Sequence, residues 1–125
     1  MIQFLMIMND CGVVRYRKVF VNDNTFLLDN YKVACIYQHI LKTKSTFTNN
    51  FKVDDSFESH ITYRQYANLY FIIGSDSDKY TSKYNILIHN LVERIDLKFN
   101  YISSEANIIS NNLVINDIIE SMNII

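Results

Sequence analysis

The chain has 125 residues, of which 49% are apolar, and a formal net charge of −1. A chain of this length forms one domain, residues 1–125, and buries about two thirds of its unfolded surface without needing disulfides or metals. The near-zero charge excludes any chain-wide attraction to nucleic acid or anionic lipid, so electrostatic recognition must be local.

The first residues predict a β-hairpin. Residues 2–8 are almost all apolar, as in a strand that is covered on both faces. Residues 9–12 have the composition of a hairpin turn, and residues 13–21 predict a second strand. Alternation along the second strand predicts Arg15 and Arg17 on one face. The same alternation predicts Val14, Tyr16 and Phe20 on the other face.

The middle of the chain predicts a helix and then more strands. Between residues 27 and 44, apolar side chains form one broad helical arc, which is typical of an amphipathic helix. Its members are Leu27, Tyr31, Val33, Ala34, Tyr37, Ile40 and Leu41. Residues 43–56 are polar and predict a loop. Residues 60–73 predict two or three strands that end in a turn at Gly74, and Gly12 marks the earlier turn.

The last third of the chain predicts two helices. A stripe with a period of 3.6 residues lies on the first of them: Tyr84, Leu87, Ile88, Leu91, Val92, Ile95 and Phe99. A second apolar pattern follows between residues 108 and 122. The predicted order is therefore β-β-α-β-β-β-α-α, an α/β (α+β) domain in which helices flank a mainly antiparallel sheet of about five strands.

Two aliphatic residues of the first C-terminal helix, Ile86 and Leu97, fall on its polar side. Single exposed aliphatic residues are common on protein surfaces. Two of them on one helix face, in a chain rich in apolar residues, are as compatible with a partner-facing patch as with chance.

Sequence motifs for catalysis or cofactor binding are absent. Three histidines and two cysteines, Cys11 and Cys35, form no local nucleophile or zinc signature, and the acids of residues 76–78 lack the rest of a calcium loop. We therefore expect no enzyme activity, disulfide, metal or other cofactor. The segment 2–8 is too short to span a membrane and lacks a cleavage site, so we expect the fold to begin at the first residue.

Three motifs in order resemble one protein family. The chain begins Met1-Ile2-Gln3-Phe4 and continues through Asn9, Gly12, Arg15 and Lys18; residues 63–71 read YRQYANLYF; residues 88–93 read IHNLVE and are followed by Phe99. Together they resemble the sigma, or small, subunit of clathrin-associated adaptor protein complexes over nearly the whole chain.

The resemblance implies a longin-type fold and a non-enzymatic role. Such a subunit joins two large subunits, one of which grips it directly, and one medium subunit in a heterotetramer that links cargo to membranes in vesicle transport. It is implied to be cytoplasmic and peripheral on coated vesicles or on trans-Golgi, endosomal or plasma membranes. A free-standing longin domain, or a small subunit of another coat, is the alternative.

The family also binds acidic dileucine sorting signals, which place an acid three residues before a Leu-Leu or Leu-Ile pair in cargo tails. Carried over by resemblance, Arg15 faces the acid of the signal. The implied leucine pocket is lined by Ala67, Leu69, Val92 and Ile102, although residues 102–105 depart from the usual family pattern. From the residues alone, a place in the core is favoured over a pocket for Ala67, Leu69 and Val92.

The side chains expected to contact partner subunits are Ile86, Leu97, Tyr66 and Tyr70. The two aliphatic residues are chosen for their place on the polar helix face. The two tyrosines belong to the aromatic run at residues 63–71.

Overall fold

The computed structural model describes residues 1–21, 28–44, 49–53, 59–99, 108 and 110–122. Its elements follow one another in the predicted order. They are β1 (Ile2–Asn9), β2 (Val14–Val19), α1 (Asn30–Thr43), β3 (Asn50–Lys52), β4 (His60–Tyr66), β5 (Leu69–Ser75), α2 (Thr81–Lys98) and α4 (Asn112–Ser121).

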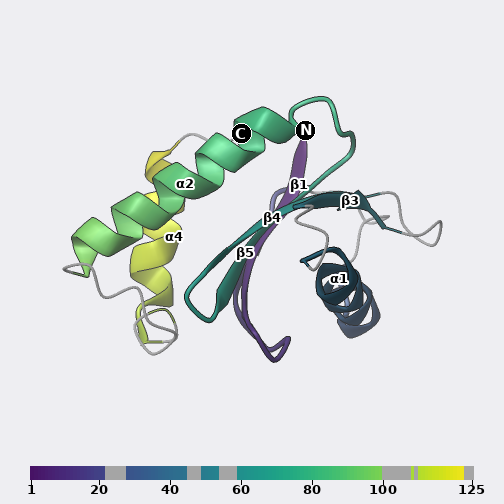
Figure 1. Ribbon diagram of the computed structural model, residues 1–125. Helices are drawn as coiled ribbons and strands as arrows, with labels where there is room; N and C mark the ends of the chain where they lie inside the picture. The colour runs from purple at the N-terminus through teal and green to yellow at the C-terminus, as the bar shows by residue number, and fades with distance from the viewer. Residues whose placement is uncertain (22–27, 45–48, 54–58, 100–107, 109, 123–125) are drawn as a thin grey trace.

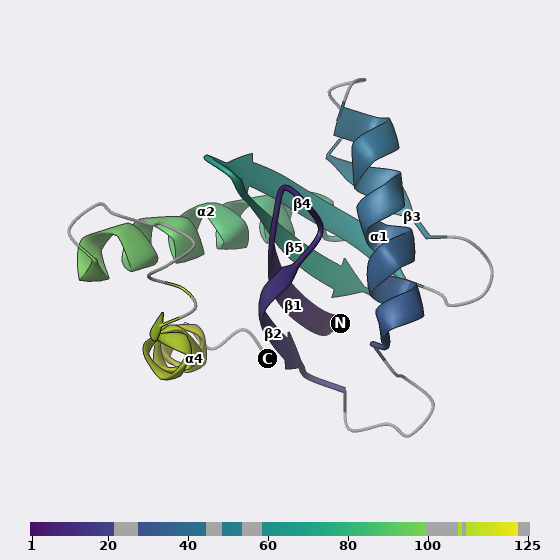
Figure 2. The ribbon, with the colours of Figure 1, turned by 90° about the horizontal axis from the view of Figure 1, so that it is seen from below.

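The five strands form one sheet in the order β2-β1-β5-β4-β3, and all neighbouring strands are antiparallel. Helix α1 covers one face of the sheet, whereas α2 and α4 lie on the other (Figures 1 and 2). The fold class predicted from the sequence is thus confirmed.

The core is divided between the two faces of the sheet because β1 is apolar on both sides. Leu5 and Ile7 pack in the cluster under α2 and α4. The alternate residues Phe4, Met6 and Met8 pack in the cluster under α1. This arrangement confirms the prediction that residues 2–8 form a strand covered on both faces.

The predicted alternation along β2 is wrong at its start. Ile7 pairs with Tyr16, but the next residue, Met8, pairs with Val14, so the strand contains a β-bulge. Val14 consequently packs on the α1 side, whereas Tyr16 belongs to the cluster on the opposite face. Val14 and Tyr16 therefore do not share a face.

Two predictions in the middle of the chain are also wrong. The polar segment predicted as a loop contains β3, a three-residue strand that pairs with β4. Gly74 lies inside β5 and not at a turn. A Cβ atom at this position would overlap the ring of Phe4, so the glycine makes room for a large core side chain.

Helix α1 is capped by Asp29, whose side chain accepts a hydrogen bond of 2.9 Å from the backbone N–H of Lys32. Its buried residues are Val33, Ile36 and Ile40. The predicted apolar arc includes two residues that do not belong to the core, because Tyr31 and Leu41 are exposed.

The two helices on the other face match their predicted patterns. In α2 the buried side chains are Tyr84, Ile88, Leu91, Val92 and Ile95. In α4 they are Ile115 and Ile119. None of the helices among the described residues has the length and apolarity that a membrane crossing requires.

Candidate functional site

The turn between β1 and β2 is organised by the side chain of Asn9. Its Oδ1 accepts hydrogen bonds from the backbone N–H groups of Cys11, at 3.0 Å, and Val13, at 2.9 Å. Gly12 has φ +87°, a conformation that glycine adopts without strain. The turn thereby fixes where β2 begins beside β1.

Arg15 is the extra residue of the bulge in β2. The residues on either side of it, Val14 and Tyr16, pair with the adjacent Met8 and Ile7 of β1, so the register skips Arg15. Its carbonyl oxygen accepts a hydrogen bond of 3.3 Å from the side-chain amide of Asn112, which precedes the buried part of α4. Bulges commonly redirect a side chain next to a functional site.

The turn between β4 and β5 is a tight hairpin in which Tyr66 pairs with Leu69. Ala67 is the first of the two turn residues and has φ +54°, the one positive φ among the described non-glycine residues. In this left-handed conformation a residue with a Cβ atom is strained by roughly 1–2 kcal/mol, so glycine is the usual residue there. Gln65 donates a hydrogen bond of 3.1 Å to the Ala67 carbonyl and steadies the turn.

Both turns lie at one end of the sheet, away from the N-terminus (Figure 1). Strand β1 runs between β2 and β5, and its residue Met8 pairs with Val14 on one side and Tyr70 on the other. Asn9, the next residue, pairs with Leu69. The structure therefore places Arg15, Ala67 and Leu69 at the same end of three adjacent strands.

Leu69 and Val92 belong to the core cluster on the face of the sheet that α2 and α4 cover. Leu69 is 0% exposed and Val92 is 5% exposed. Ala67 is exposed and Arg15 is partly buried. Three of the five residues assigned to signal binding, Arg15, Ala67 and Leu69, thus lie at one end of the sheet. Val92 packs into the core from α2, and Ile102 lies outside the described residues.

The two tyrosines expected at a partner contact have different surroundings. Tyr66 is partly buried, with its ring 5.8 Å from that of Phe71 and 5.5 Å from the Arg64 guanidinium. Tyr70 is 0% exposed on the opposite face of the sheet, where its hydroxyl accepts a hydrogen bond from Lys44 Nζ at 3.1 Å. The assignment of Tyr70 as a partner contact is corrected, because its side chain has no surface to offer.

The two aliphatic residues assigned to partner contact are on the surface of α2. Ile86 is 63% exposed and Leu97 is 64% exposed. Both side chains therefore lie away from the core stripe of the helix, as their positions on its polar side predicted.

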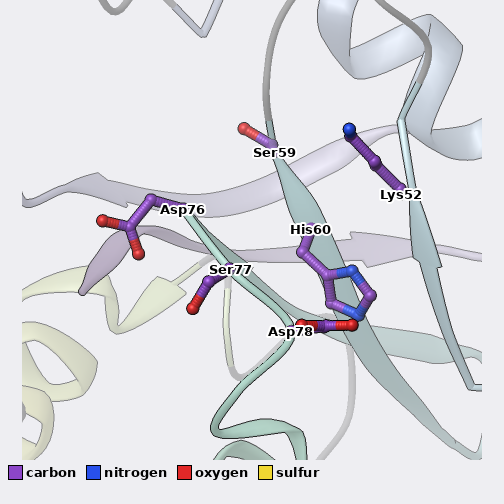
Figure 3. A pocket seen from close by; sticks show the side chains of 6 residues that line it. All are labelled: Lys52, Ser59, His60, Asp76, Ser77 and Asp78. Carbon is purple, nitrogen blue, oxygen red and sulfur yellow. The ribbon is translucent and has the colours of Figure 1, made fainter.

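A polar pocket of about 360 Å³ lies at the opposite end of the sheet (Figure 3). It is lined by Lys52, Ser59, His60, Asp76, Ser77 and Asp78. Burial lowers the pKa of His60, and the nearby carboxylate of Asp78 acts in the other direction. The Nε2 atom of His60 is buried without a hydrogen-bond partner among the described residues. Sequence reasoning missed this pocket, since its acids read as solvated loop residues.

No metal site is apparent in the part of the chain that the structure describes, because no three His, Cys, Asp or Glu side chains gather in a suitable arrangement. Cys11 is exposed and Cys35 is partly buried, and both are free thiols. Neither the metal search nor the two thiols bear on the assignment of Arg15 and Ala67 to signal binding.

Comparison with known proteins places the chain among vesicle adaptors. The family model of the clathrin adaptor complex small chain matches residues 1–124. The AP-2 complex subunit sigma of Saccharomyces cerevisiae is 33% identical over 99 residues, which are 78% of this chain and 67% of that protein.

The fold is also similar to that of one chain in an adaptor complex. A chain in the homology model of the full-length AP-3 complex in a stretched open conformation aligns with a TM-score of 0.71 and 23% identity. The alignment covers 98% of this chain and 80% of the other. The sequence motifs, the sheet order and these matches together show that this chain belongs to the clathrin adaptor complex small chain family.

Proposed function

We propose that this protein is the small subunit of a heterotetrameric adaptor complex and that, within it, the Arg15 end of the sheet helps bind acidic dileucine signals. One large subunit would hold it directly, and a second large and a medium subunit would complete the complex. Membrane attachment on vesicles would come through that complex. The placement of Arg15, Ala67 and Leu69 at one end of three adjacent strands is the observation that carries the cargo proposal.

The dimensions of this surface suit such a signal. Arg15 lies on β2 and Leu69 on β5, with β1 between them, so their backbones are separated by two strand spacings, about 10 Å. Three residues of extended peptide also span about 10 Å. A peptide crossing the strand ends can therefore put its acid near Arg15 while its leucines reach the turn at Ala67.

Burial decides how the leucines would be held. Because Leu69 and Val92 are packed in the core, they supply an apolar floor and not an open cavity. We place the leucine side chains against the exposed Ala67 turn and the partly buried ring of Tyr66. A side chain larger than alanine at residue 67 would obstruct this approach.

The expected affinity is low. Two leucines contribute roughly 1.5–3 kcal/mol each when fully buried, and an exposed charge pair contributes under about 1 kcal/mol. Ordering the peptide and restricting its motion offset much of this gain, which leaves an affinity in the micromolar range or weaker. Membrane-bound cargo would then be retained by several simultaneous contacts.

The test is Arg15→Glu in the assembled complex, with an acidic dileucine peptide as the probe. Reversing this charge should weaken peptide binding about fivefold, since it removes an attraction and adds a repulsion. Binding can be measured by fluorescence anisotropy.

Arg17→Glu is the matched control for this measurement. Arg17 is an exposed arginine of the same strand whose guanidinium donates a hydrogen bond to the Leu28 carbonyl, at 3.1 Å, away from the proposed site. Equal peptide affinities for wild type, Arg15→Glu and Arg17→Glu would exclude Arg15 from signal binding.

A further inference from the structure

The polar pocket at the end of the sheet away from Ala67 is lined by residues of β3, β4 and the segment that follows β5. Lys52 of β3 is directly opposite His60 of β4, and His60 is in turn opposite Ser75 of β5. Residues that are directly opposite each other in an antiparallel pair project to the same face of the sheet. The side chains of Lys52 and His60 therefore reach the pocket from the same face (Figure 3).

The imidazole of His60 has a hydrogen-bonding atom that the described residues do not use. Its Nε2 atom is buried and has no partner among them, whereas buried polar atoms in proteins nearly always have one. Burial lowers the pKa of His60, so the ring is neutral at neutral pH. With the ring proton on Nδ1, the Nε2 atom offers an acceptor to a donor group of a ligand.

Two charged side chains of the lining flank His60 (Figure 3). Lys52 and Asp78 are both exposed, and neither forms a salt bridge within the described part of the chain. Asp76 is already paired, because its Oδ1 atom lies 2.7 Å from the amino group of Met1. The lining therefore presents one cation, one anion and one neutral acceptor.

This combination of groups is unsuited to a simple ion. A lone anion would be repelled by Asp78, and a lone cation would be repelled by Lys52. A ligand that carries both a positive and a negative group satisfies the two side chains at once. The pocket volume of about 360 Å³ is near the lower limit for small-molecule sites, so such a ligand must be small.

The spacing of the two charged residues distinguishes between small zwitterions. Lys52 lies on β3 and Asp78 follows β5, and these strands are separated by β4, so their backbones are about 10 Å apart. An α-amino acid holds its ammonium and carboxylate groups on one carbon atom, which keeps the charges close together. A phosphodiester of ethanolamine separates them by two carbons and an ester oxygen, and its single negative charge matches the single lysine.

We propose that this pocket binds an ethanolamine phosphate group, which occurs in phosphatidylethanolamine and in its soluble form, glycerophosphoethanolamine. The ammonium group donates hydrogen bonds to the Asp78 carboxylate and to His60 Nε2, and the phosphate pairs with Lys52. The site lies at the end of the sheet opposite the proposed signal site and does not depend on signal binding.

The first test titrates glycerophosphoethanolamine into the full chain, purified with whatever subunits accompany it, and follows binding by calorimetry or ligand-observed NMR. A ligand of about 13 non-hydrogen atoms with ordinary efficiency has a dissociation constant of about 1 mM. Glycerophosphocholine carries the same charges without N–H donors, so it should bind at least about tenfold more weakly. Equal affinities for the two compounds would overturn the proposal.

Two shorter compounds test the need for both charges and for their spacing. Glycerol phosphate lacks the ammonium group, and glycine holds its two charges on one carbon atom. Each should bind at least about fivefold more weakly than glycerophosphoethanolamine. Tight binding of glycine would contradict the two-carbon spacing, and tight binding of glycerol phosphate would show a plain anion site.

Substitutions at the two charged residues locate the ligand in this pocket. Lys52→Gln and Asp78→Asn should each weaken binding of glycerophosphoethanolamine about fivefold, because each removes one exposed charge pair. Lys42→Gln and Asp117→Asn are the matched controls, since they make the same changes at exposed positions on α1 and α4. The controls should change the affinity less than about twofold, and unchanged affinity in both pocket variants would exclude this site.

His60→Phe tests the acceptor, because it keeps an aromatic ring and removes Nε2. This variant should lose the preference for glycerophosphoethanolamine over glycerophosphocholine. If the variant does not fold, the wild-type chain gives the same information through the nitrogen chemical shift of His60 Nε2. That resonance should move when glycerophosphoethanolamine is added, and a resonance that does not move would refute the contact.

Vesicles without net charge separate the two sources of the group. If the lipid is the source, vesicles of phosphatidylcholine with phosphatidylethanolamine should retain the full chain more strongly than phosphatidylcholine alone, and Asp78→Asn should remove the difference. Binding of glycerophosphoethanolamine without any vesicle preference would support the site and assign it to the soluble compound. Absence of saturable binding in both measurements would overturn the proposal.

Discussion

At the scale of single residues, Gly74 shows how one missing side chain determines the packing of the sheet. It lies inside β5, where strands rarely place glycine because it packs no side chain. The ring of Phe4, which is 0% exposed, occupies the space that a side chain at residue 74 would fill. A glycine that looked like a turn signal in the sequence is therefore a packing residue.

The Gly74→Ala substitution should lower the free energy of unfolding by about 1–3 kcal/mol, because the added methyl group overlaps the Phe4 ring in a close-packed core. Urea unfolding would measure the change. Adding Phe4→Leu should recover part of the loss, since the smaller side chain vacates the contested space. An unchanged midpoint in Gly74→Ala would contradict the described contact.

Tyr16 gives the protein a predictable response to high pH. Burial, and secondarily the carboxylate of Glu120, raise the pKa of Tyr16 from 10.0 to about 12. Between these values the unfolded chain loses the phenolic proton while the folded chain keeps it. The stabilising contribution is thus fully present below pH 10 and is lost as pH rises toward 12.

The Tyr16→Phe variant should lose less stability than the wild type between pH 10 and about 12, as followed by unfolding at successive pH values. The decline should not vanish, because burial also raises the pKa values of Tyr63 and Tyr84. Identical declines in the two proteins would show that Tyr16 ionises normally in the folded state.

At the scale of elements, α4 is attached to the edge strand β2 by polar as well as apolar contacts. The side-chain oxygen of Asn116 accepts hydrogen bonds of 3.0 Å from both the Tyr16 hydroxyl and Lys18 Nζ. Lys18 also contacts Glu120 at 3.2 Å. Because Ile115 and Ile119 anchor the same helix in the core, these contacts fix its orientation on the sheet.

Replacing Asn116 by Ala should destabilise the protein by about 1–3 kcal/mol, because the buried hydroxyl of Tyr16 loses its acceptor. Thermal or urea unfolding can measure this cost. Asp117→Ala is the control, since Asp117 is the exposed neighbour on the same helix and surface changes usually have effects within about 0.5 kcal/mol. Equal effects of the two substitutions would argue against a role for Asn116 in holding α4.

The elements that could be predicted from the sequence are those with a pattern of their own. Strand β1 is apolar over most of its length, and α2 repeats its buried residues with helical spacing. Strand β3 has only three residues and owes its conformation to pairing with β4, so its sequence carries no such signal. The bulge at Arg15 likewise follows from the pairing of two strands and cannot be read from one of them.

The candidate site was predictable only in part for a related reason. The family resemblance selected Arg15, Ala67, Leu69 and Val92. The structure places the first three at one end of the sheet and Val92 in the core cluster that also contains Leu69. The apolar pattern could not distinguish residues that line a pocket from residues packed in the core, because the side chain is the same in both places. The positive φ of Ala67 also had no sequence signal, since glycine is the usual residue there.

At the scale of the whole molecule, the proposed subunit contact and the proposed signal site lie on different surfaces. The first is on the outer face of α2, and the second is at one end of the sheet. The inner face of α2 completes the core, and its outer face exposes Ile86 and Leu97. Arg15 and Ala67 lie at one end of the sheet, whereas Ile86 and Leu97 lie on the outer surface of α2, so the proposed signal site can be changed without substituting the residues expected to contact a partner subunit.

The central claim is that this chain works as one subunit of an adaptor heterotetramer. The direct measurement is to isolate the tagged chain from its own cells under mild conditions and to quantify the proteins that accompany it by mass spectrometry. Two large adaptor subunits and one medium subunit, in amounts equal to the tagged chain, are the predicted result. Recovery of the chain as a free monomer, without any large subunit, would contradict the account.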